Sequence, residues 1–331
     1  MTSPSIAFIS QLPIDEQKSW QKQLSKLLPN ESIVLAGQLT DEQKQQCSIA
    51  IVADPDPQEV MQFTHLFWCH SLWAGVDSLV SAFNPEAGAN GMANKTSNTD
   101  GLKFNISRLI DPRLAQTMSE AVLTWTLYLH REMHIYQQQQ NKAIWQQLDY
   151  RLAGDRTIGI LGLGELGKTS ALRLKENGFN VLGWSRNKKQ IKGVSCLSGV
   201  LGLTKLAQQS DIIVCLLPLT ADTQHLINKE FLQELPTKAC IINFARGGII
   251  NNDDLLYFLK NEQLSHAVLD VFEHEPLALA SEFWHHPQVT VLPHVSAPTD
   301  RYTAAAIVAE NIKKFRQTGE LPPCVDLASG Y

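Results

Sequence analysis

The sequence predicts an α/β protein with two parallel sheets, on the basis of its length and of two series of alternating strands and helices. The chain has 331 residues, of which 44% are hydrophobic, so two domains of ordinary size can each bury a core. Short apolar runs alternate with polar helical stretches over residues 1–82, and a second such series runs from Thr157 to about residue 295. Strands that alternate with helices favour parallel sheets, because parallel neighbours need a long crossover connection.

Charge and the length of the apolar runs exclude several classes of protein. The formal net charge is -5, so no basic surplus indicates a nucleic-acid partner. The longest apolar stretches, such as residues 211–218, have the length of a strand and are too short to span a membrane. Residues 1–10 lack a basic segment followed by an apolar run, and the six cysteines lack metal-type spacing. We therefore expect a reduced, cytoplasmic protein without a nucleic-acid partner, a membrane partner or a metal.

The first series contains three predicted strands and one clear helix. Residues 5–9, 33–35 and 48–53 are apolar runs of strand length, and residues 15–28 have helical character. Residues 84–100 are different, since they consist of Asn, Gly, Ala, Ser and Thr with almost no large apolar residue. This composition predicts a flexible surface insertion.

A long helix is predicted between the two series, from about residue 111 to residue 140. Apolar residues recur along it every three or four positions, at Met118, Val122, Trp125, Leu129 and Met133. His130 and His134 have the spacing of metal ligands on one helix face, but no cysteine or third ligand accompanies them. We interpret both histidines as surface or interface packing residues.

A glycine-rich turn opens the second series and predicts a dinucleotide site. Residues 157–161 form a buried strand, Gly162, Gly164 and Gly167 follow it in a G-x-G-x-x-G pattern, and residues 168–176 have helical character. The first glycine permits a tight turn, the second lets the backbone approach a pyrophosphate, and the third lets the helix pack close to the strand. The free N–H groups at the helix start would then bind the phosphates.

The end of the next strand indicates which dinucleotide binds. Residues 180–184 predict a strand, and Ser185 follows at the position where an NAD site usually has Asp or Glu. A carboxylate there would repel a 2′-phosphate by about 4 kcal/mol at ~4 Å and an effective dielectric of ~20. Ser185 and the guanidinium of Arg186 reverse this preference, since a charge-assisted hydrogen bond contributes roughly 1.5–3 kcal/mol. We expect NADP(H) to be preferred and NAD(H) to be possible. The alternative is that residues 186–189 form a solvated basic loop.

Three polar residues follow later predicted strands and fit one kind of chemistry. Arg246, Glu275 and His294 each come just after an apolar run, and open α/β sheets bind ligands at the carboxyl ends of their strands. An arginine can bind a carboxylate bidentately, and a histidine can donate a proton to a carbonyl oxygen while hydride reaches the carbon. The glutamate can orient the imidazole. Each residue taken alone could equally be structural.

The order of these motifs resembles that of the D-isomer-specific 2-hydroxyacid dehydrogenases over nearly the whole chain. The segments that carry the resemblance are residues 162–167, 217–223, 243–248, 270–276 and 293–294. Within the family the chain is most similar to the glyoxylate/hydroxypyruvate reductase A branch, through residues 74–78, 183–186 and 330–331.

The resemblance implies a role for each matching residue. Arg246 would bind the substrate carboxylate together with the backbone N–H groups of Ala74, Gly75 and Val76. His294 would bind substrate and donate the proton, with Glu275 as its partner. The implied cofactor-binding positions are Gly162, Leu163, Gly164, Glu165, Leu166, Gly167, Ser185, Arg186, Leu217, Pro218, Thr223, Ala245 and Asp270. Asp270 would hold the nicotinamide carboxamide.

The resemblance also implies a discontinuous architecture. Residues 1–108 together with 297–331 would form a flavodoxin-like, substrate-binding domain, and residues 109–296 would form an NAD(P)-binding Rossmann domain. The active site would lie in a cleft between the two domains. The helix over residues 111–140 resembles the dimerisation segment of the family, so we expect a homodimer.

The leading functional hypothesis is NADPH-dependent reduction of a small 2-keto acid, of the glyoxylate or hydroxypyruvate type, to the 2-hydroxy acid. Two departures from the family pattern affect the substrate: the insertion at residues 84–100, and Trp73 where a small residue is expected in the substrate-binding turn. One alternative is a dinucleotide-sensing, corepressor-like binding protein. The other is a dehydrogenase for a different 2-hydroxy acid.

Overall fold

The computed structural model describes residues 5–83 and 104–326, which form two compact units. The first unit comprises the chain up to Asp111 and again from Thr299, and the second comprises Pro112–Pro298. These divisions lie two or three residues from the domain limits expected from the sequence. The insertion expected at residues 84–100 and the ending at residues 330–331 lie outside the described residues.

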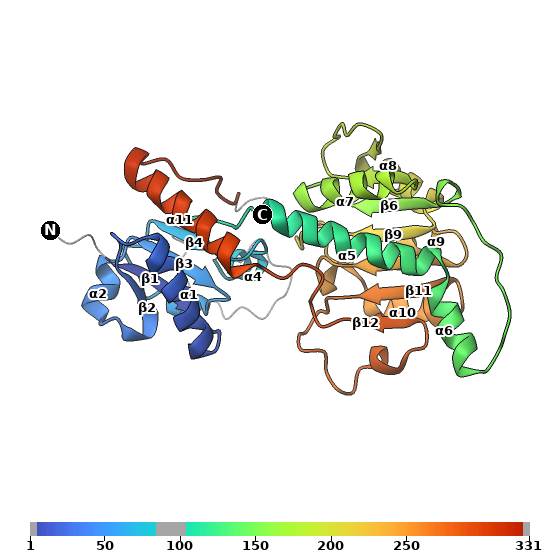
Figure 1. Cartoon of the computed structure of the whole chain (residues 1–331), viewed down its shortest axis with the longest axis horizontal. Coiled ribbons are helices and arrows are strands. Elements are labelled where there is room, and N and C mark those ends of the chain that lie inside the picture. The colour runs from blue at the N-terminus through green and yellow to red at the C-terminus, as the bar shows by residue number, and fades with distance from the viewer. Residues whose placement is uncertain (1–4, 84–103, 327–331) are drawn as a thin grey trace. The chain divides into compact units, whose positions relative to one another are not determined.

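The first unit contains a five-stranded parallel sheet in the order β2-β1-β3-β4-β5 (Figure 1). Its strands are β1 (Ile6–Ser10), β2 (Ile33–Leu35), β3 (Ile49–Ala53), β4 (Trp68–Ser71) and β5 (Asn105–Ser107). The α-helices are α1 (Ile14–Leu27), α2 (Asp41–Gln46), α3 (Pro57–Val60), α4 (Asp77–Phe83) and α11 (Arg301–Thr318), with a 3-10 turn at Ala36–Gln38.

Both faces of this sheet are buried, since alternate residues of a strand point to opposite sides and every residue of β1 and β3 is buried. Ile6 and Phe8 pack with Trp20 of α1 and Ile312 of α11 in one core cluster. The opposite face packs against α3 and α4. Helix α11 thus joins a segment from the end of the chain to a sheet built from its beginning.

The second unit contains a seven-stranded parallel sheet in the order β12-β11-β10-β9-β6-β7-β8. Its strands are β6 (Thr157–Leu161), β7 (Asn180–Trp184), β8 (Ser195–Leu197), β9 (Ile212–Cys215), β10 (Ala239–Asn243), β11 (Leu264–Leu269) and β12 (Val289–Val291). The helices are α5 (Pro112–His130), α6 (Met133–Asn141), α7 (Glu165–Glu176), α8 (Gly199–Gln209), α9 (Lys229–Gln233) and α10 (Asn252–Lys260), with 3-10 turns at Ala153–Asp155, Gly247–Ile249 and Glu282–His285.

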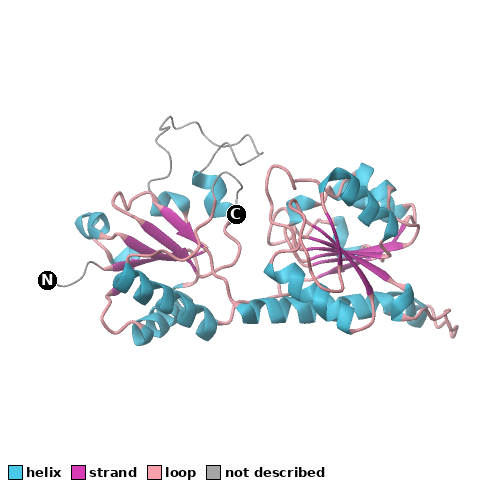
Figure 2. Ribbon diagram, turned by 90° about the horizontal axis from the view of Figure 1, so that it is seen from above, coloured by secondary structure: helices cyan, strands magenta, loops and turns pink. Residues whose placement is uncertain are grey.

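Helices cover both faces of this second sheet, as Figure 2 shows. Residues of α5 and α7 pack on one face, and residues of α8, α9 and α10 pack on the other. The strand order reverses at β6, which has β7 on one side and β9 on the other. Open α/β sheets bind ligands at such a reversal, beyond the carboxyl ends of the strands. The predicted α/β class with two parallel sheets is therefore confirmed.

The single helix expected over residues 111–140 is wrong, because the chain forms two helices there. Helix α5 ends at His130 and α6 begins at Met133, with Glu132 between them in the left-handed conformation at φ 55°. The Glu132 carboxylate forms an ion pair with Arg156, which lies just before β6. This contact with a residue distant in sequence accompanies the break, and the helical periodicity on either side did not indicate it.

His130 and His134 are buried, with 4% and 2% of their surface exposed, so the expectation of surface positions was also wrong. His134 Nε2 lies 3.0 Å from the Ser265 hydroxyl of β11. Among the described residues no group of three or more His, Cys, Asp or Glu could hold a metal ion. Within residues 5–83 and 104–326, none of the helices is long and apolar enough to cross a membrane. All six cysteines are free thiols.

Candidate active site

The predicted site residues of the second unit follow six neighbouring strands of one parallel sheet. Because the strands are parallel, their carboxyl ends share one edge of the sheet. The residues follow β6 (Gly162–Gly167), β7 (Ser185, Arg186), β9 (Leu217, Pro218, Thr223), β10 (Ala245, Arg246), β11 (Asp270, Glu275) and β12 (His294). The candidate cofactor residues thus lie mainly at the centre of the sheet, and the candidate catalytic residues lie toward the β12 side.

The turn between β6 and α7 has the shape that a dinucleotide phosphate site needs. Gly162 adopts φ 101°, and a Cβ on Gly167 would lie 1.8 Å from the carbonyl oxygen of Gly162. Gly164 caps the N-terminus of α7, and a Cβ placed on it would meet no atom within 4 Å. The first and third glycines therefore let strand and helix pack closely, while the second leaves open space in front of the helix N–H groups. This arrangement fits a pyrophosphate.

The loop after β7 carries a guanidinium and no carboxylate at the expected ribose position. The Ser185 hydroxyl donates to the carbonyl oxygen of Asn187 at 2.8 Å, so the serine stabilises its own loop. Arg186 has 46% of its side chain exposed and forms an ion pair with Asp222, with 3.1 Å between Nη2 and Oδ2. The guanidinium is therefore accessible, but it is already in contact with an anion.

The Thr223 hydroxyl group makes two of the hydrogen bonds that shape the loop after β9. Thr223 Oγ1 donates to the carbonyl oxygen of Pro218 at 2.6 Å and accepts from the Thr220 N–H at 2.8 Å. Leu217 and Thr223 are both buried. The structure thus gives Thr223 a role in shaping the loop, and its contact with a cofactor stays a prediction.

Farther along this edge, the turn that carries Arg246 is shaped by Asn243, the last residue of β10. The Asn243 side chain accepts from the Ala245 N–H at 3.1 Å and donates to the Arg246 carbonyl oxygen at 3.0 Å. A Cβ on the next residue, Gly247, would lie 1.9 Å from the carbonyl carbon of Phe272. Only glycine fits there, so the backbone beside Arg246 packs directly against the segment after β11 that leads to Glu275.

Glu275 and His294 form a hydrogen-bonded pair. The His294 Nδ1 atom lies 2.8 Å from Glu275 Oε2, and Glu275 Oε1 accepts from the Phe272 N–H at 2.9 Å. The His294 side chain is 54% exposed. The carboxylate therefore contacts one ring nitrogen and leaves Nε2, the other ring nitrogen, for a reacting molecule.

Asp270 connects the loop after β11 to the segment that contains His294. Its carboxylate is 2% exposed and accepts from the N–H groups of Val295 and Ser296 at 2.7 and 2.9 Å. Its carbonyl oxygen accepts from the His294 N–H at 3.0 Å. Asp270 thus positions the backbone of His294, which has φ 56°. Its expected contact with the nicotinamide stays a prediction.

In the first unit, Ala74, Gly75 and Val76 lie between β4 and α4, directly before the first helical residue. The N–H groups at a helix start have no partner within the helix, so they can bind an anion. The turn borders a cavity of about 30 Å³, which is lined by Val52, Asp54, Pro55, Ser71, Trp73, Gly75, Val76, Ser78 and Leu79. The Trp73 ring also contacts the Trp20 ring edge-on, with 5.9 Å between centroids.

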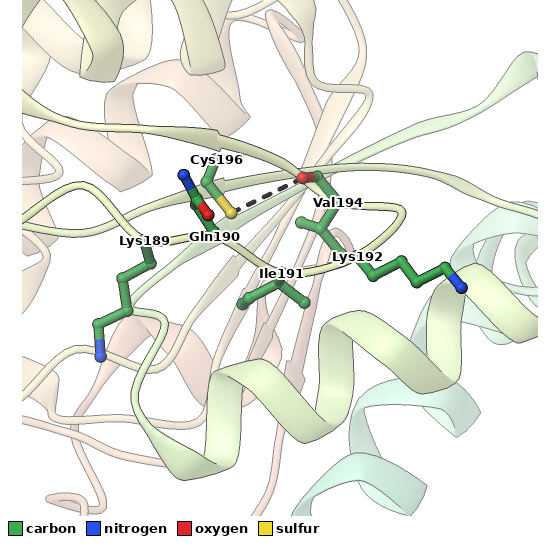
Figure 3. Close-up of a pocket in the computed structure, with 6 residues that line it drawn as sticks. All are labelled: Lys189, Gln190, Ile191, Lys192, Val194 and Cys196. Atoms are coloured by element: carbon green, nitrogen blue, oxygen red, sulfur yellow. Dashed lines mark hydrogen bonds between the residues drawn. The ribbon is translucent and has the colours of Figure 1, made fainter.

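A larger cavity of about 520 Å³ lies in the loop between β7 and β8 (Figure 3). It is lined by Lys189, Gln190, Ile191, Lys192, Val194 and Cys196. None of the predicted site residues lines it. It is open to the surface and is lined by one short segment, so volume alone does not make it the active site.

Comparison with known proteins identifies the family. The model of the D-isomer specific 2-hydroxyacid dehydrogenase NAD binding domain matches residues 123–296. Glyoxylate/hydroxypyruvate reductase A of Yersinia enterocolitica is 34% identical over 319 residues, which cover 96% of this chain and 98% of that protein. The protein of the same name from Serratia proteamaculans is 35% identical over 320 residues, covering 96% of this chain and 98% of that protein.

Solved structures agree with this match. A D-isomer specific 2-hydroxyacid dehydrogenase from Xanthobacter autotrophicus Py2, in complex with NADPH and MES, is 32% identical with a TM-score of 0.87, covering 99% of this chain and 100% of that chain. An NADPH-dependent glyoxylate/hydroxypyruvate reductase from Sinorhizobium meliloti, in complex with NADP and sulfate, is 29% identical with a TM-score of 0.85, covering 99% of both chains.

The chain belongs to the D-isomer specific 2-hydroxyacid dehydrogenases. As a member of this family it is an NAD(P)-dependent enzyme that acts on 2-hydroxy acids or the corresponding 2-keto acids. The family predicted from the sequence is thereby confirmed.

The sequence did not indicate the structural roles of three residues of this dehydrogenase, although Asp270 was expected to bind the cofactor. Asn243 shapes the arginine turn, Asp270 holds the backbone at His294, and Asp222 pairs with Arg186. An asparagine just before a turn was a usable signal, because its side chain often bonds to nearby backbone. The contacts of the two aspartates join distant segments, so no local pattern could have revealed them.

Proposed function

We propose that this dehydrogenase uses NADPH to reduce a small 2-keto acid, of the glyoxylate or hydroxypyruvate type, to the 2-hydroxy acid. The observation that carries the proposal is the hydrogen bond of 2.8 Å between His294 Nδ1 and Glu275 Oε2 at the end of the sheet. The names of the relatives from Yersinia and Serratia support this substrate class. The NADPH and NADP bound in the two compared structures support the cofactor.

In the proposed mechanism, His294 donates a proton from Nε2 to the carbonyl oxygen of the substrate. Glu275 accepts the hydrogen bond from Nδ1–H, which fixes the ring so that the proton for transfer lies on Nε2. The Phe272 N–H holds the other carboxylate oxygen, so Glu275 itself cannot rotate freely. When bound, the reduced nicotinamide supplies the hydride.

Arg246 is proposed to bind the substrate carboxylate, because a guanidinium forms paired hydrogen bonds with a carboxylate. The N–H groups of Ala74, Gly75 and Val76 are proposed to bind the same group. Holding the carboxylate at a fixed place sets the distance between the carbonyl group and the proton donor, and this positioning is a large part of catalysis.

NADP(H) is proposed as the preferred cofactor because β7 is followed by Ser185 and Arg186, without the Asp or Glu that an NAD site usually has at this strand end. A 2′-phosphate carries up to two negative charges and attracts a guanidinium. NADH lacks this phosphate and gains nothing from Arg186, so it remains a possible but weaker cofactor.

A steady-state assay tests the proposal directly. NADPH and NADH oxidation would be followed with glyoxylate, hydroxypyruvate, pyruvate and phenylpyruvate in parallel. Fast turnover of the first two acids with NADPH supports the proposal. A preference for NADH would contradict only the proposed role of Arg186. Tight NADPH binding without turnover of any acid would instead favour a dinucleotide-sensing protein.

We also propose a homodimer in the cytoplasm. The segment after α6 exposes several large apolar side chains of the second unit: Ile144, Trp145, Tyr150 and Leu152. Trp145 is fully exposed in the isolated chain, and a second copy could cover it. Light scattering of the purified protein distinguishes a dimer from a monomer, and replacing Trp145 by Ala is expected to weaken the dimer.

A further inference from the structure

The ion pair between Arg186 and Asp222 connects the loops on either side of the glycine-rich turn. Arg186 follows β7, Asp222 follows β9, and β6 lies between these two strands in the sheet. Strands in a sheet are about 4.8 Å apart, so the two loops start roughly 10 Å from each other. The contact of 3.1 Å between Nη2 and Oδ2 therefore spans the carboxyl end of β6. The turn that begins at Gly162 follows this strand directly.

The loop that carries Asp222 is held in a defined shape. Thr223 Oγ1 bonds to Pro218 and Thr220 within the same loop. These bonds fix the backbone beside Asp222, whose side chain is 78% exposed and whose carboxylate contacts Arg186. An ion pair exposed to this extent is weak and can exchange one anion for another.

We propose that Asp222 is a specificity-determining residue that competes with the 2′-phosphate of NADPH for Arg186. The proposal rests on the proposed function in one respect, because it takes Arg186 as the residue that binds the phosphate. Binding of NADPH requires Arg186 to exchange the carboxylate of Asp222 for the phosphate. After the exchange the carboxylate remains close to the phosphate and repels it. Both effects weaken the binding of NADPH and leave NADH, which has no 2′-phosphate, unaffected.

The test compares D222N with the wild-type protein in binding experiments without a keto acid. Asparagine keeps the size of the side chain and removes its charge. We expect the Kd of NADPH to fall about fivefold, which corresponds to the upper range for an exposed ion pair. We expect the Kd of NADH to stay the same. Raising the salt concentration is expected to reduce the gain, because salt screens exposed charges.

The matched control is D253N, which removes the same charge from an exposed position in the first turn of α10 in the same unit. It is expected to leave both dissociation constants unchanged. In the double variant R186A/D222N the gain for NADPH is expected to shrink, because the competition for Arg186 is gone.

Three results would overturn the inference. Weaker NADPH binding by D222N would show that Asp222 positions Arg186 for the phosphate. Equal gains for NADPH and NADH would show a general effect of the loop. Unchanged NADPH binding by R186A would refute the assignment of Arg186 itself. Because binding is measured without turnover, failure of the reductase proposal in the steady-state assay would be a separate result.

Discussion

Acidification is expected to destabilise the folded chain through three buried histidines. His70 of β4, His134 of α6 and His266 of β11 are each no more than 3% exposed. Burial lowers the pKa of His70 to about 4, even though its hydrogen bond to the Ser71 carbonyl acts in the opposite direction. Burial, followed by the charge of Arg156, lowers the pKa of His134 to about 4. Burial, followed by the neighbouring His134, lowers the pKa of His266 to about 3.

The bonding of each ring explains why the neutral form is favoured. The His70 Nδ1 atom lies 2.9 Å from the Ser71 carbonyl oxygen, and its Nε2 atom lies 2.9 Å from the Asn311 side-chain amide, which donates. An added proton on Nε2 would face that amide donor. The Nδ1 atoms of His134 and His266 are buried without a hydrogen-bond partner among the described residues. A proton added there would have no acceptor.

The size of the effect follows from the difference between folded and unfolded pKa values. An unfolded histidine titrates near pH 6.5, so below this pH the unfolded chain binds more protons than the folded one. The free energy of unfolding therefore falls as the pH decreases from about 6.5, and it levels off only below the folded pKa values. Between about pH 7 and pH 5 each histidine is expected to cost about 2 kcal/mol. One of the three histidines lies in the first unit and two lie in the second, so the free energy of unfolding of the second unit is expected to fall about twice as much.

Urea unfolding of the wild type and H266Q at the two pH values measures one of these contributions. Glutamine keeps a group that can bond the Thr290 hydroxyl, which lies 2.9 Å from His266 Nε2, and it cannot be protonated. Between about pH 7 and pH 5, the free energy of unfolding of the wild type is expected to fall by about 2 kcal/mol more than that of H266Q. H65Q is the matched control, since His65 is exposed. If wild type and H266Q respond to pH in parallel, the buried histidine is not the cause.

Three further predictions concern the active site. H294A is expected to lower kcat about 10²- to 10⁴-fold with little change in the Kd of NADPH, and E275Q is expected to lower kcat at least about tenfold. Stopped-flow kinetics measures kcat, and a fluorescence titration measures the Kd. Normal turnover by H294A would contradict the role of His294 as proton donor. W73A is expected to raise kcat/KM for phenylpyruvate about tenfold relative to glyoxylate. The reason is that the cavity of about 30 Å³ beside Trp73 has room for little more than one small group. An unchanged ratio of the two kcat/KM values would show that Trp73 does not contact the substrate. D270N is expected to lower the free energy of unfolding by about 1–3 kcal/mol, because the NH₂ group of asparagine cannot accept one of the two backbone N–H bonds that Asp270 accepts. Thermal unfolding measures this loss, and an unchanged melting temperature would contradict it.

The regular parts of the fold could be predicted because their signals are local. The strands at residues 157–161 and 180–184 were predicted with the same limits that β6 and β7 have in the structure. Each is an apolar run next to a glycine-rich or polar segment, and such a run forms a buried strand of a parallel sheet. The break between α5 and α6 could not be predicted, because neither glycine nor proline marks it and the partner of Glu132 lies near the start of β6.

In the candidate site, too, residues with a local sequence signal could be predicted, and residues whose partners are distant in sequence could not. Arg246, Glu275 and His294 could be singled out because each follows a strand, and parallel strands bring their carboxyl ends to one edge. In the structure His294 lies 2.8 Å from Glu275, and the backbone of Gly247, next to Arg246, packs on Phe272. Their catalytic roles stay predictions. Asp222 could not be found, because an exposed aspartate in a polar loop carries no sequence signal for a partner across the sheet.

The geometry of the candidate catalytic residues depends on backbone contacts more than on contacts between charges. Asn243 of β10 pairs in register with Leu269 of β11, and Leu269 pairs with Val291 of β12, so the three loops start side by side. The Gly247 backbone packs on Phe272, the Phe272 N–H bonds Glu275, and Asp270 binds two N–H groups beyond His294. Each loop is therefore held by its neighbour, and the pairing of the strands sets where the proton donor lies. Because each of these supports involves the backbone, we expect that substitutions at Trp73, which change substrate preference, or at Asp222, which change cofactor preference, leave the His294–Glu275 pair undisturbed.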